Sequence, residues 1–294
     1  MGDERRLLDL AHEMWHTDRH RMNFETSFGT LAWEGPAVGR ARLFERDGHL
    51  VAWARLTPGY DRIRRVGERD TAPPNLVWMV DWRDPDADEL LISIIDWAES
   101  RSDAPFTTSH AIADDVARAI LVSRGYAPDP REPFGIYLQL GLPAASHQPV
   151  DGYTLTTMAE LGDVELRAAA HRVAWDGSTR TAADVGRTMS QWPYRADLDV
   201  VALTDSGEPV GSALAWYDRA YDYGEFEPVG VGPDHRGRGL ARSMLRFGLE
   251  RLSEAGASHA VVGARGDDDY PIPRQVYGSV GFQRFATQQI VRRP

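Results

Sequence analysis

A glycine- and arginine-rich stretch, from Tyr223 to Leu245, holds the residue types best suited to chemistry in this sequence. An alternating apolar strand pattern leads through a polar turn at 232–235 into Arg236-Gly-Arg-Gly-Leu-Ala241, which opens a helical pattern. Glycine lets the backbone approach an anion, and the first turn of a helix offers unpaired N–H groups and the positive end of its dipole. Arg236 and Arg238 add charge and forked donors for phosphate oxygens. The stretch therefore predicts a pyrophosphate cradle.

The spacing of this cradle fits neither G-x-x-x-x-G-K-[ST] nor G-x-G-x-x-G. The order of valine, proline, arginine, two glycines, leucine and alanine resembles the acetyl-CoA motif of the GNAT acetyltransferase superfamily. The resemblance implies that the end of the strand binds the pantetheine arm and thioester, and that the turn and helix hold the pyrophosphate. The coenzyme-binding residues implied in this way are Val229, Gly230, Val231, Arg236, Gly237, Arg238, Gly239, Leu240, Ala241, Arg242 and Ser243.

The same resemblance implies two catalytic residues. Glu225 lies on the strand before the cradle, where family members often place a general base, and Glu227 on the same strand face is the alternative. Tyr277 matches the tyrosine that family members place near the coenzyme sulfur, and a phenol with an ordinary pKa of about 10 can donate to a thiolate. Either carboxylate could instead be structural, and Tyr277 could be a core residue. Pro228 lacks an N–H and favours a local opening of the strand, whereas Tyr270 stands where the family commonly has asparagine.

The elements that must position these residues fill the second half of the chain, 152–294. A catalytic GNAT domain is predicted there, with the cradle between a strand and a long helix. We expect strands at 153–158, 198–203, 209–217, 225–231, 259–264 and from 281 to 291, and helices at 161–173, 182–191, 236–255 and 272–280.

The first half, 1–140, repeats this order of elements in outline. A hairpin, a strand, a helix, a strand, a helix and a last strand at 134–140 follow a first helix at 5–19. The strand-to-helix turn at 81–89 has no glycine and four aspartates, which would repel a pyrophosphate. We therefore predict an α/β (α+β) fold of two tandem GNAT-like domains, each a mixed twisted sheet flanked by helices. The first is degenerate and lacks the coenzyme motif, 141–151 is a linker, and the layout resembles the tandem-GNAT group that includes mycothiol synthase.

A second possible site lies in the first helix, where His12-Glu-Met-Trp-His16 matches H-E-x-x-H. On a helix the two histidines share a face, as a zinc pair would. The face also carries Leu8 and Trp15, and the downstream G-x-x-H of the extended motif is missing. We therefore expect half-buried or surface histidines and no metal.

The amino-acid composition limits the classes of molecule that the protein is expected to bind. The net charge of −11 disfavours nucleic acid as a partner. The sequence contains no run of 18 apolar residues, so no membrane-spanning helix is expected. The absence of cysteine excludes disulfides and a thiol nucleophile, and a cytoplasmic location is expected. Aromatic and acidic residues could line a pocket for a small amine; these are Trp175, Asp176, Tyr194, Trp216 and Tyr217.

The sequence therefore predicts an acetyl-CoA-dependent N-acetyltransferase, active as a monomer or homodimer. The amine would attack the thioester directly, and it could be an amino sugar, an amino acid or an antibiotic-like metabolite. The alternative is a non-catalytic acyl-CoA sensor on the same fold.

Overall fold

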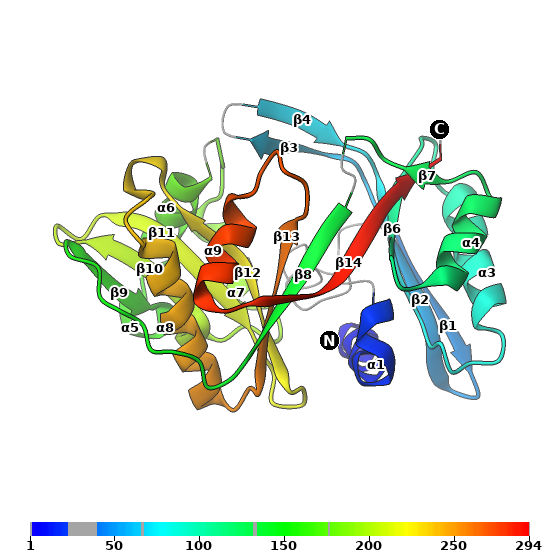
Figure 1. Cartoon of the computed structure of the whole chain (residues 1–294), viewed down its shortest axis with the longest axis horizontal. Coiled ribbons are helices and arrows are strands. Elements are labelled where there is room, and N and C mark those ends of the chain that lie inside the picture. Colours follow the sequence, from blue (N-terminus) through cyan, green and yellow to red (C-terminus); the bar gives the residue numbers. More distant parts are fainter. Residues whose placement is uncertain (1, 23–39, 66–67, 132–133, 176, 294) are drawn as a thin grey trace.

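In a computed structural model, the chain forms a mixed sheet flanked by helices (Figure 1). All residues are described except 1, 23–39, 66–67, 132–133, 176 and 294. Asp47 and Gly48 have φ of 51° and 78° and form the hairpin turn expected between the first two strands. The N-terminal half contains α1 (Gly2–Asp18), η1 (Arg19–Arg21), β1 (Arg40–Arg46), β2 (His49–Thr57), β3 (Tyr60–Arg65), β4 (Glu68–Ala72), β5 (Asn75–Val80), α3 (Ala87–Glu99), β6 (Thr107–Ala111), α4 (Asp115–Ser123), β7 (Ala127–Pro128) and β8 (Phe134–Gly141).

The C-terminal half follows the expected order, with one change near its start. A four-residue helix ends at Gly162, where φ is 65°, and Asp163 then caps the next helix, so the expected helix at 161–173 is interrupted. The elements of this half are β9 (Tyr153–Thr157), α5 (Met158–Leu161), α6 (Val164–Ala174), α7 (Ala182–Met189), η3 (Ala196–Leu198), β10 (Asp199–Thr204), β11 (Pro209–Trp216), β12 (Tyr223–Val231), η4 (Pro233–His235), α8 (Leu240–Ala255), β13 (His259–Arg265), α9 (Ile272–Val280) and β14 (Gln283–Arg292).

The two halves exchange their closing strands. Within the described residues, one sheet of 12 strands runs β1-β2-β5-β6-β14-β8-β13-β12-β11-β10-β9, with β7 beside β14, and β3 and β4 form a separate pair. The strand expected to close the first half, β8, pairs with β13 from His259↔Gly141 to Arg265↔Gly135. The last strand, β14, pairs with β6 and β8. The sheet therefore does not divide where the linker divides the sequence, and the domain limits at 140 and 152 stay a prediction.

Each half holds one parallel pair of strands joined through a helix. In the first half β5 and β6 pair in parallel and are connected by α3. In the second half β12 and β13 pair in parallel and are connected by α8. Each pair is preceded by an antiparallel hairpin, β1–β2 or β10–β11. The repeated order is the tandem arrangement predicted from the sequence.

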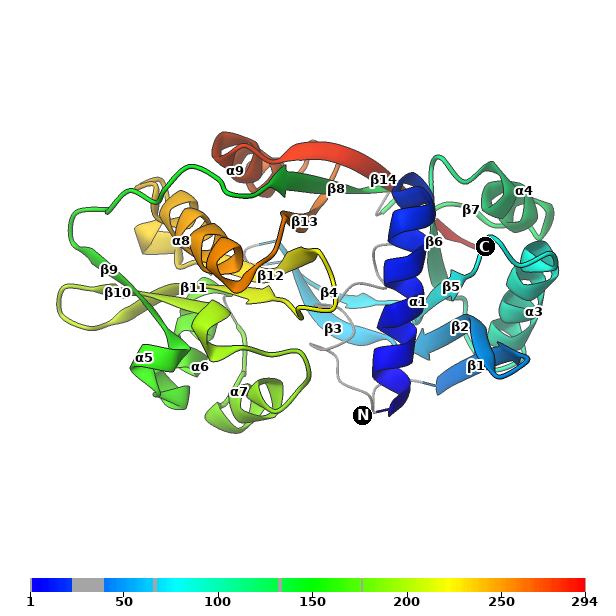
Figure 2. The same cartoon turned by 90° about the horizontal axis from the view of Figure 1, so that it is seen from below.

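Helices cover both faces of the sheet, and α1 lies across its middle (Figure 2). Along β10, Val200 packs into a core with α8 and α9, whereas Val201 packs with α5 and α6 on the opposite face. Met14 and Trp15 of α1 join a core that includes Tyr223 at the start of β12. The first helix therefore packs against the strand that leads to the cradle. No helix in the described parts of the chain is both long and apolar enough to span a membrane.

Candidate functional site

The strand before the cradle parts from its parallel neighbour. β12 and β13 pair from Tyr223↔His259 to Phe226↔Val262, and the pairing stops there although β12 continues to Val231 and β13 to Arg265. On the other side, the register of β12 with β11 shifts between Ala213 and Ala215, opposite the Glu227–Pro228 step. This confirms the local opening predicted from the proline. The opening leaves one edge of residues 227–231 without a strand partner.

Trp216 of β11 fixes the strand where it opens. Its side chain is fully buried, and its Nε1–H donates to the backbone carbonyl of Glu227 at 2.7 Å. A buried carbonyl that has lost its place in the strand ladder needs such a donor. Trp216 therefore supports the opened strand, and the expectation that it lines an amine pocket is wrong. Tyr217, expected in the same role, is also buried in the core with 3% of its surface exposed.

We refer to residues 236–243 as the cradle. Gly237 and Gly239 adopt φ of 74° and 85°, a left-handed conformation that residues with a side chain rarely take. The first helical donor recorded for α8 is the N–H of Ser243, which bonds the Gly239 carbonyl at 3.0 Å. The N–H groups of 240–242 precede it and have no partner within the helix, and the first turn contains no acidic residue. These groups fit an anion such as a pyrophosphate.

Several cradle side chains are used by the protein itself. Arg236 donates through Nε to the Val231 carbonyl at 2.9 Å and through Nη2 to the Ala174 carbonyl at 3.5 Å, so it joins the end of β12 to α6. Ser243 is buried and donates through Oγ to the Gln148 carbonyl at 2.5 Å. Leu240 lies in the core, and Ala241 packs against it. Arg238 is exposed and makes one recorded contact, to the Asp234 carbonyl at 3.3 Å. The backbone N–H groups, with the exposed side chains of Arg238 and Arg242, are thus the groups of the cradle best placed to meet an anion from solvent.

The corresponding turn of the N-terminal half has its N–H groups occupied. The N–H of Asp84 bonds the Asp81 carbonyl at 3.0 Å, and the N–H of Arg83 bonds the Asp81 carboxylate at 2.9 Å. The N–H of Asp86 bonds the Asp84 carboxylate at 2.9 Å. Two carboxylates and one carbonyl of the turn therefore satisfy these N–H groups.

Two carboxylates share a face of β12. Glu225 is 5% exposed and lies opposite Trp216 on β11 and Val261 on β13. Glu227, two residues on, keeps part of its surface exposed. Burial, and then the charge of Glu225, raise the pKa of Glu227 to about 7. Glu227 can therefore gain and lose a proton near neutral pH, which suits a general base.

Tyr277 on α9 interacts electrostatically with Glu227. It is 8% exposed, and burial raises the pKa of its phenol, helped by the charges of Glu227 and Tyr270. The phenol therefore stays protonated at neutral pH and can serve as a proton donor. The charge of Glu227 thus links it to both Glu225 and Tyr277, whereas Glu225 itself lies in the part of β12 that still pairs with β13.

The loop after α6 covers the end of β12. A Cβ placed on Gly230 would lie 2.5 Å from the Trp175 ring, so the indole rests directly on the strand backbone. Of the other residues expected in the pocket, Tyr194 donates its hydroxyl to Asp199 at 3.1 Å, and Asp176 lies outside the described residues. Of these residues, Trp175 is thus the one whose ring packs on the backbone of β12.

His171 is a site residue that the sequence analysis missed. Its ring stacks on Trp175 with centroids 4.4 Å apart, and its Nδ1 lies 2.9 Å from the Ser178 hydroxyl. Burial lowers the pKa of His171 to about 3, and the charges of Arg180 and two further arginines act in the same direction. The signal in the sequence was the i, i+4 spacing of His171 and Trp175, which places both on one face of a helix.

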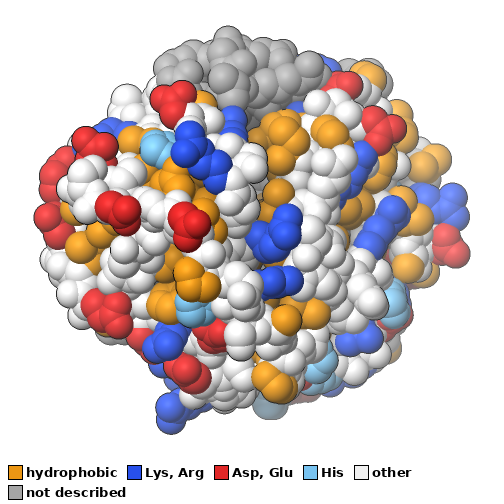
Figure 3. Space-filling view, turned by 60° about the vertical axis from the view of Figure 1, so that its left-hand side comes forward, with side chains coloured by type: hydrophobic (Ala, Val, Ile, Leu, Met, Phe, Trp, Pro, Cys, Tyr) orange, Lys and Arg blue, Asp and Glu red, His pale blue; other side chains and the backbone are white. Residues whose placement is uncertain are grey.

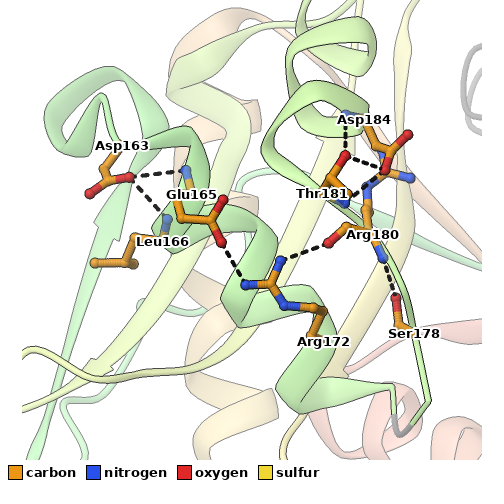
Figure 4. Close-up of polar contacts among 8 residues, drawn as sticks. All are labelled: Asp163, Glu165, Leu166, Arg172, Ser178, Arg180, Thr181 and Asp184. Atoms are coloured by element: carbon orange, nitrogen blue, oxygen red, sulfur yellow. Dashed lines mark hydrogen bonds and ion pairs between the residues drawn. The ribbon is translucent and has the colours of Figure 1, made fainter.

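Polar contacts hold this loop between α6 and α7 (Figure 4). Arg172 donates to the Arg180 carbonyl and to the Glu165 carboxylate, both at 2.7 Å. Thr181 and Asp184 form a capping box that starts α7. The loop that begins with Trp175 is therefore held in place at both its α6 end and its α7 end.

The linker packs against α8 beside the cradle. The N–H of His147 donates to Glu250 at 2.9 Å, and a cavity of about 210 Å³ lies between the linker, β9 and the start of α8. Tyr153 on β9 lines this cavity, and its hydroxyl lies 2.9 Å from Nδ1 of His235 in the turn before the cradle. The linker and β9 thus brace the helix whose N-terminus faces the proposed anion.

Comparison with known proteins assigns a family to the C-terminal part. Residues 166–282 match the model of the Acetyltransferase (GNAT) family. A mycothiol acetyltransferase of Nocardiopsis dassonvillei is 32% identical over 114 residues, which make up 39% of this chain and 29% of that protein. One from Corynebacterium aurimucosum is 33% identical over 93 residues, 29% of this chain and 30% of that protein. The matched stretch thus spans less than a third of each of these relatives.

Solved structures resemble the whole chain. A GCN5-related N-acetyltransferase from Sphaerobacter thermophilus has a TM-score of 0.65 at 20% identity and covers 99% of this chain and 92% of its own. A tandem GNAT protein from the clavulanic acid biosynthesis pathway has a TM-score of 0.66 at 15% identity, covering 98% of this chain and 94% of its own. At such identities the likeness concerns the fold, and it extends over both halves.

Proposed function

We propose that this chain, whose residues 166–282 match the GNAT acetyltransferase family, transfers an acetyl group from acetyl-CoA to the amine of a small molecule. The observation that carries the proposal is the parting of β12 from β13 after Phe226, directly before a cradle in which the N–H groups of 240–242 have no partner within the helix. The opening suits the pantetheine arm, and the cradle suits the pyrophosphate. The turn at 81–86, whose N–H groups are occupied, offers no second cradle, so we expect one active centre.

Acetyl-CoA supplies the reaction with an acetyl group activated as a thioester. The opened edge at Val229, Gly230 and Val231 would hold this end, where a backbone N–H can stabilise negative charge on the carbonyl oxygen. The N–H groups of the cradle and its exposed arginines, Arg238 and Arg242, would hold the pyrophosphate. Figure 3 shows separate basic side chains in the middle of one face of the molecule, among hydrophobic and neutral ones, although the net charge of the chain is −11.

The amine must lose a proton as its nitrogen attacks the carbonyl carbon. We assign the accepting group to Glu227 in preference to Glu225, because its pKa of about 7 and its partial exposure suit proton exchange through water. As the carbon–sulfur bond breaks, Tyr277 would donate its proton to the departing sulfur. The products are the N-acetyl amine and the free thiol.

The acceptor would lie against Trp175, whose ring covers Gly230. The arginines that lower the pKa of His171 would act in the same direction on an amine bound beside it. A lowered amine pKa increases the neutral fraction that can attack. The charge around the pocket is therefore compatible with a nucleophilic amine.

The test is a screen of amino sugars, amino acids and polyamines for acetyl-CoA-dependent thiol release. We expect at least one amine class to be acetylated, with one product amide formed per thiol. Tight acetyl-CoA binding by calorimetry with no turnover on any amine would favour a sensor instead. Absence of acetyl-CoA binding would overturn the proposal.

A further inference from the structure

The histidines of the H-E-x-x-H sequence lie where α1 meets the C-terminal half. The rings of His12 and His16 have centroids 4.5 Å apart, as expected for residues one helical turn apart. His12 also packs edge-on against Tyr221, with centroids 4.6 Å apart. The face of α1 that carries the pair therefore points to the segment just before β12.

A third ligand-type residue, Asp222, comes from that segment. Its carboxylate Oδ1 lies 3.6 Å from Nε2 of His16, and one ligand atom from each of the three residues lies within 4.8 Å of the others. Its backbone carbonyl accepts from the N–H groups of Ser258 and His259 at 2.8 and 3.2 Å, which fixes the position of the residue. The cluster joins parts of the sequence that no local motif connects.

Two buried polar atoms of this cluster lack hydrogen-bond partners within the described part of the chain. They are Nδ1 of His12 and Oδ1 of Asp222. A buried nitrogen or carboxylate oxygen without a partner is unfavourable, and most are satisfied in native proteins. A bound cation, together with its water ligands, would satisfy such atoms.

We propose that His12, His16 and Asp222 bind a divalent transition metal such as Zn²⁺, which fastens α1 to the start of β12. Two imidazoles and a carboxylate are ligands that zinc uses in proteins. Zinc–ligand distances of about 2.0–2.1 Å place tetrahedral ligand atoms about 3.3 Å apart, so the 4.8 Å cluster must tighten. The His16 side chain is 53% exposed and can make this adjustment, and water can complete the coordination.

The arrangement does not fit a metalloprotease. In that chemistry the glutamate of H-E-x-x-H acts beside the metal as a general base. Here Glu13 forms an ion pair with Arg83, with Oε2 and Nη2 2.5 Å apart. Arg83 also binds Asp81, so Glu13 is tied to the turn after β5. The site is therefore structural: it holds the N-terminal helix against the strand that carries Glu225 and Glu227.

The test is calorimetric titration of zinc chloride into untagged, chelator-treated full-length protein. We expect one saturable site, and we expect His16→Gln and Asp222→Asn each to weaken binding at least about tenfold. Both positions are partly exposed, at 53% and 38% of the side chain, so the variants should fold. His49→Gln, which removes an exposed histidine on β2, is the matched control and should bind like the wild type.

A second measurement, thermal melting, tests whether zinc stabilises the fold. Zinc should raise the melting temperature of the wild type and of His49→Gln, because a ligand that binds only the folded state stabilises it. It should leave His16→Gln unchanged. No saturable zinc site in the wild type, or equal zinc affinity in His16→Gln and Asp222→Asn, would overturn the proposal and leave a plain His16–Asp222 ion pair.

Discussion

Glu227 and Tyr277 come from different elements, β12 and α9, yet burial and then the charge of the carboxylate raise the pKa of the phenol. The sequence placed both near the coenzyme through a family resemblance, but it favoured Glu225 over Glu227 as the base. The ranking depends on burial and on the distance to a second charge, which are properties of the folded chain. In the same way, no local pattern could bring Asp222 to His12 and His16.

Replacement of Glu227 by glutamine should lower kcat at least about 100-fold, the usual contribution of a general base. The wild-type rate should rise with pH through about 7, because the base must be ionised, and this rise should disappear in the variant. The measurement is a pH–rate profile of thiol release. Glu225→Gln should keep the rise but move it to lower pH, since it removes a charge that raises the pKa of Glu227.

A stability measurement serves as a control for Glu227→Gln. A raised pKa in the folded state means that the ionised Glu227 disfavours folding as pH rises from the unfolded value of 4.5 through about 7. Glu227→Gln should therefore melt at or above the wild-type temperature at pH 8. A wild-type rate in Glu227→Gln would show that the base is elsewhere.

Tyr277→Phe should lower kcat by about 100-fold or more while the KM for acetyl-CoA changes little, because only the proton donor is lost. Tyr217→Phe is the matched control. Tyr217 is buried, and its hydroxyl lies near Gly256 at the C-terminal end of α8, far from the cradle. Equal effects of the two substitutions would assign Tyr277 a packing role.

At the scale of elements, the β12–turn–α8 unit was predictable because its signals are local. The glycines at 237 and 239 give the φ values that the turn requires, and Pro228 marks the opened strand. The roles of Arg236 and Ser243 side chains were not predictable, since their acceptors at 174, 231 and 148 depend on how α6 and the linker pack.

Gly239→Val should weaken acetyl-CoA binding at least about tenfold, because a β-branched residue at φ of 85° distorts the cradle. The strain of a left-handed conformation is about 1–2 kcal/mol. Gly207→Val is a matched control, since Gly207 has φ of 84° and equally open space around its missing Cβ, but lies in the β10–β11 hairpin. Calorimetry should show wild-type affinity in Gly207→Val, and equal loss in both variants would refute the cradle.

At the scale of the whole molecule, the sequence predicted the repeated order of elements but not the exchange of β8 and β14. Strand order within a half follows from local patterns, whereas the neighbour of a closing strand is a long-range property. The last strand of each repeat looks the same in sequence whether it pairs with its own half or with the other.

The exchange predicts that neither half folds alone. Residues 152–294 expressed separately lack β6, β7 and β8. In this fragment β13 loses its pairing with β8, and β14 loses its pairing with β6, β7 and β8. We expect this fragment to be unfolded by circular dichroism, and co-expression with residues 1–151 to restore a folded complex. A folded, acetyl-CoA-binding 152–294 fragment would contradict this expectation.

The position of β14 also affects how the protein folds during synthesis. β14 is the last strand of the sheet to be translated, yet it pairs with β6 in the half that is translated first. The first half therefore leaves the ribosome with one sheet edge open, and it cannot close this edge before the second half has been made. During that interval a chaperone, or the β14 strand of a neighbouring nascent chain, could occupy the edge. In the second case the two polypeptides would form a domain-swapped pair.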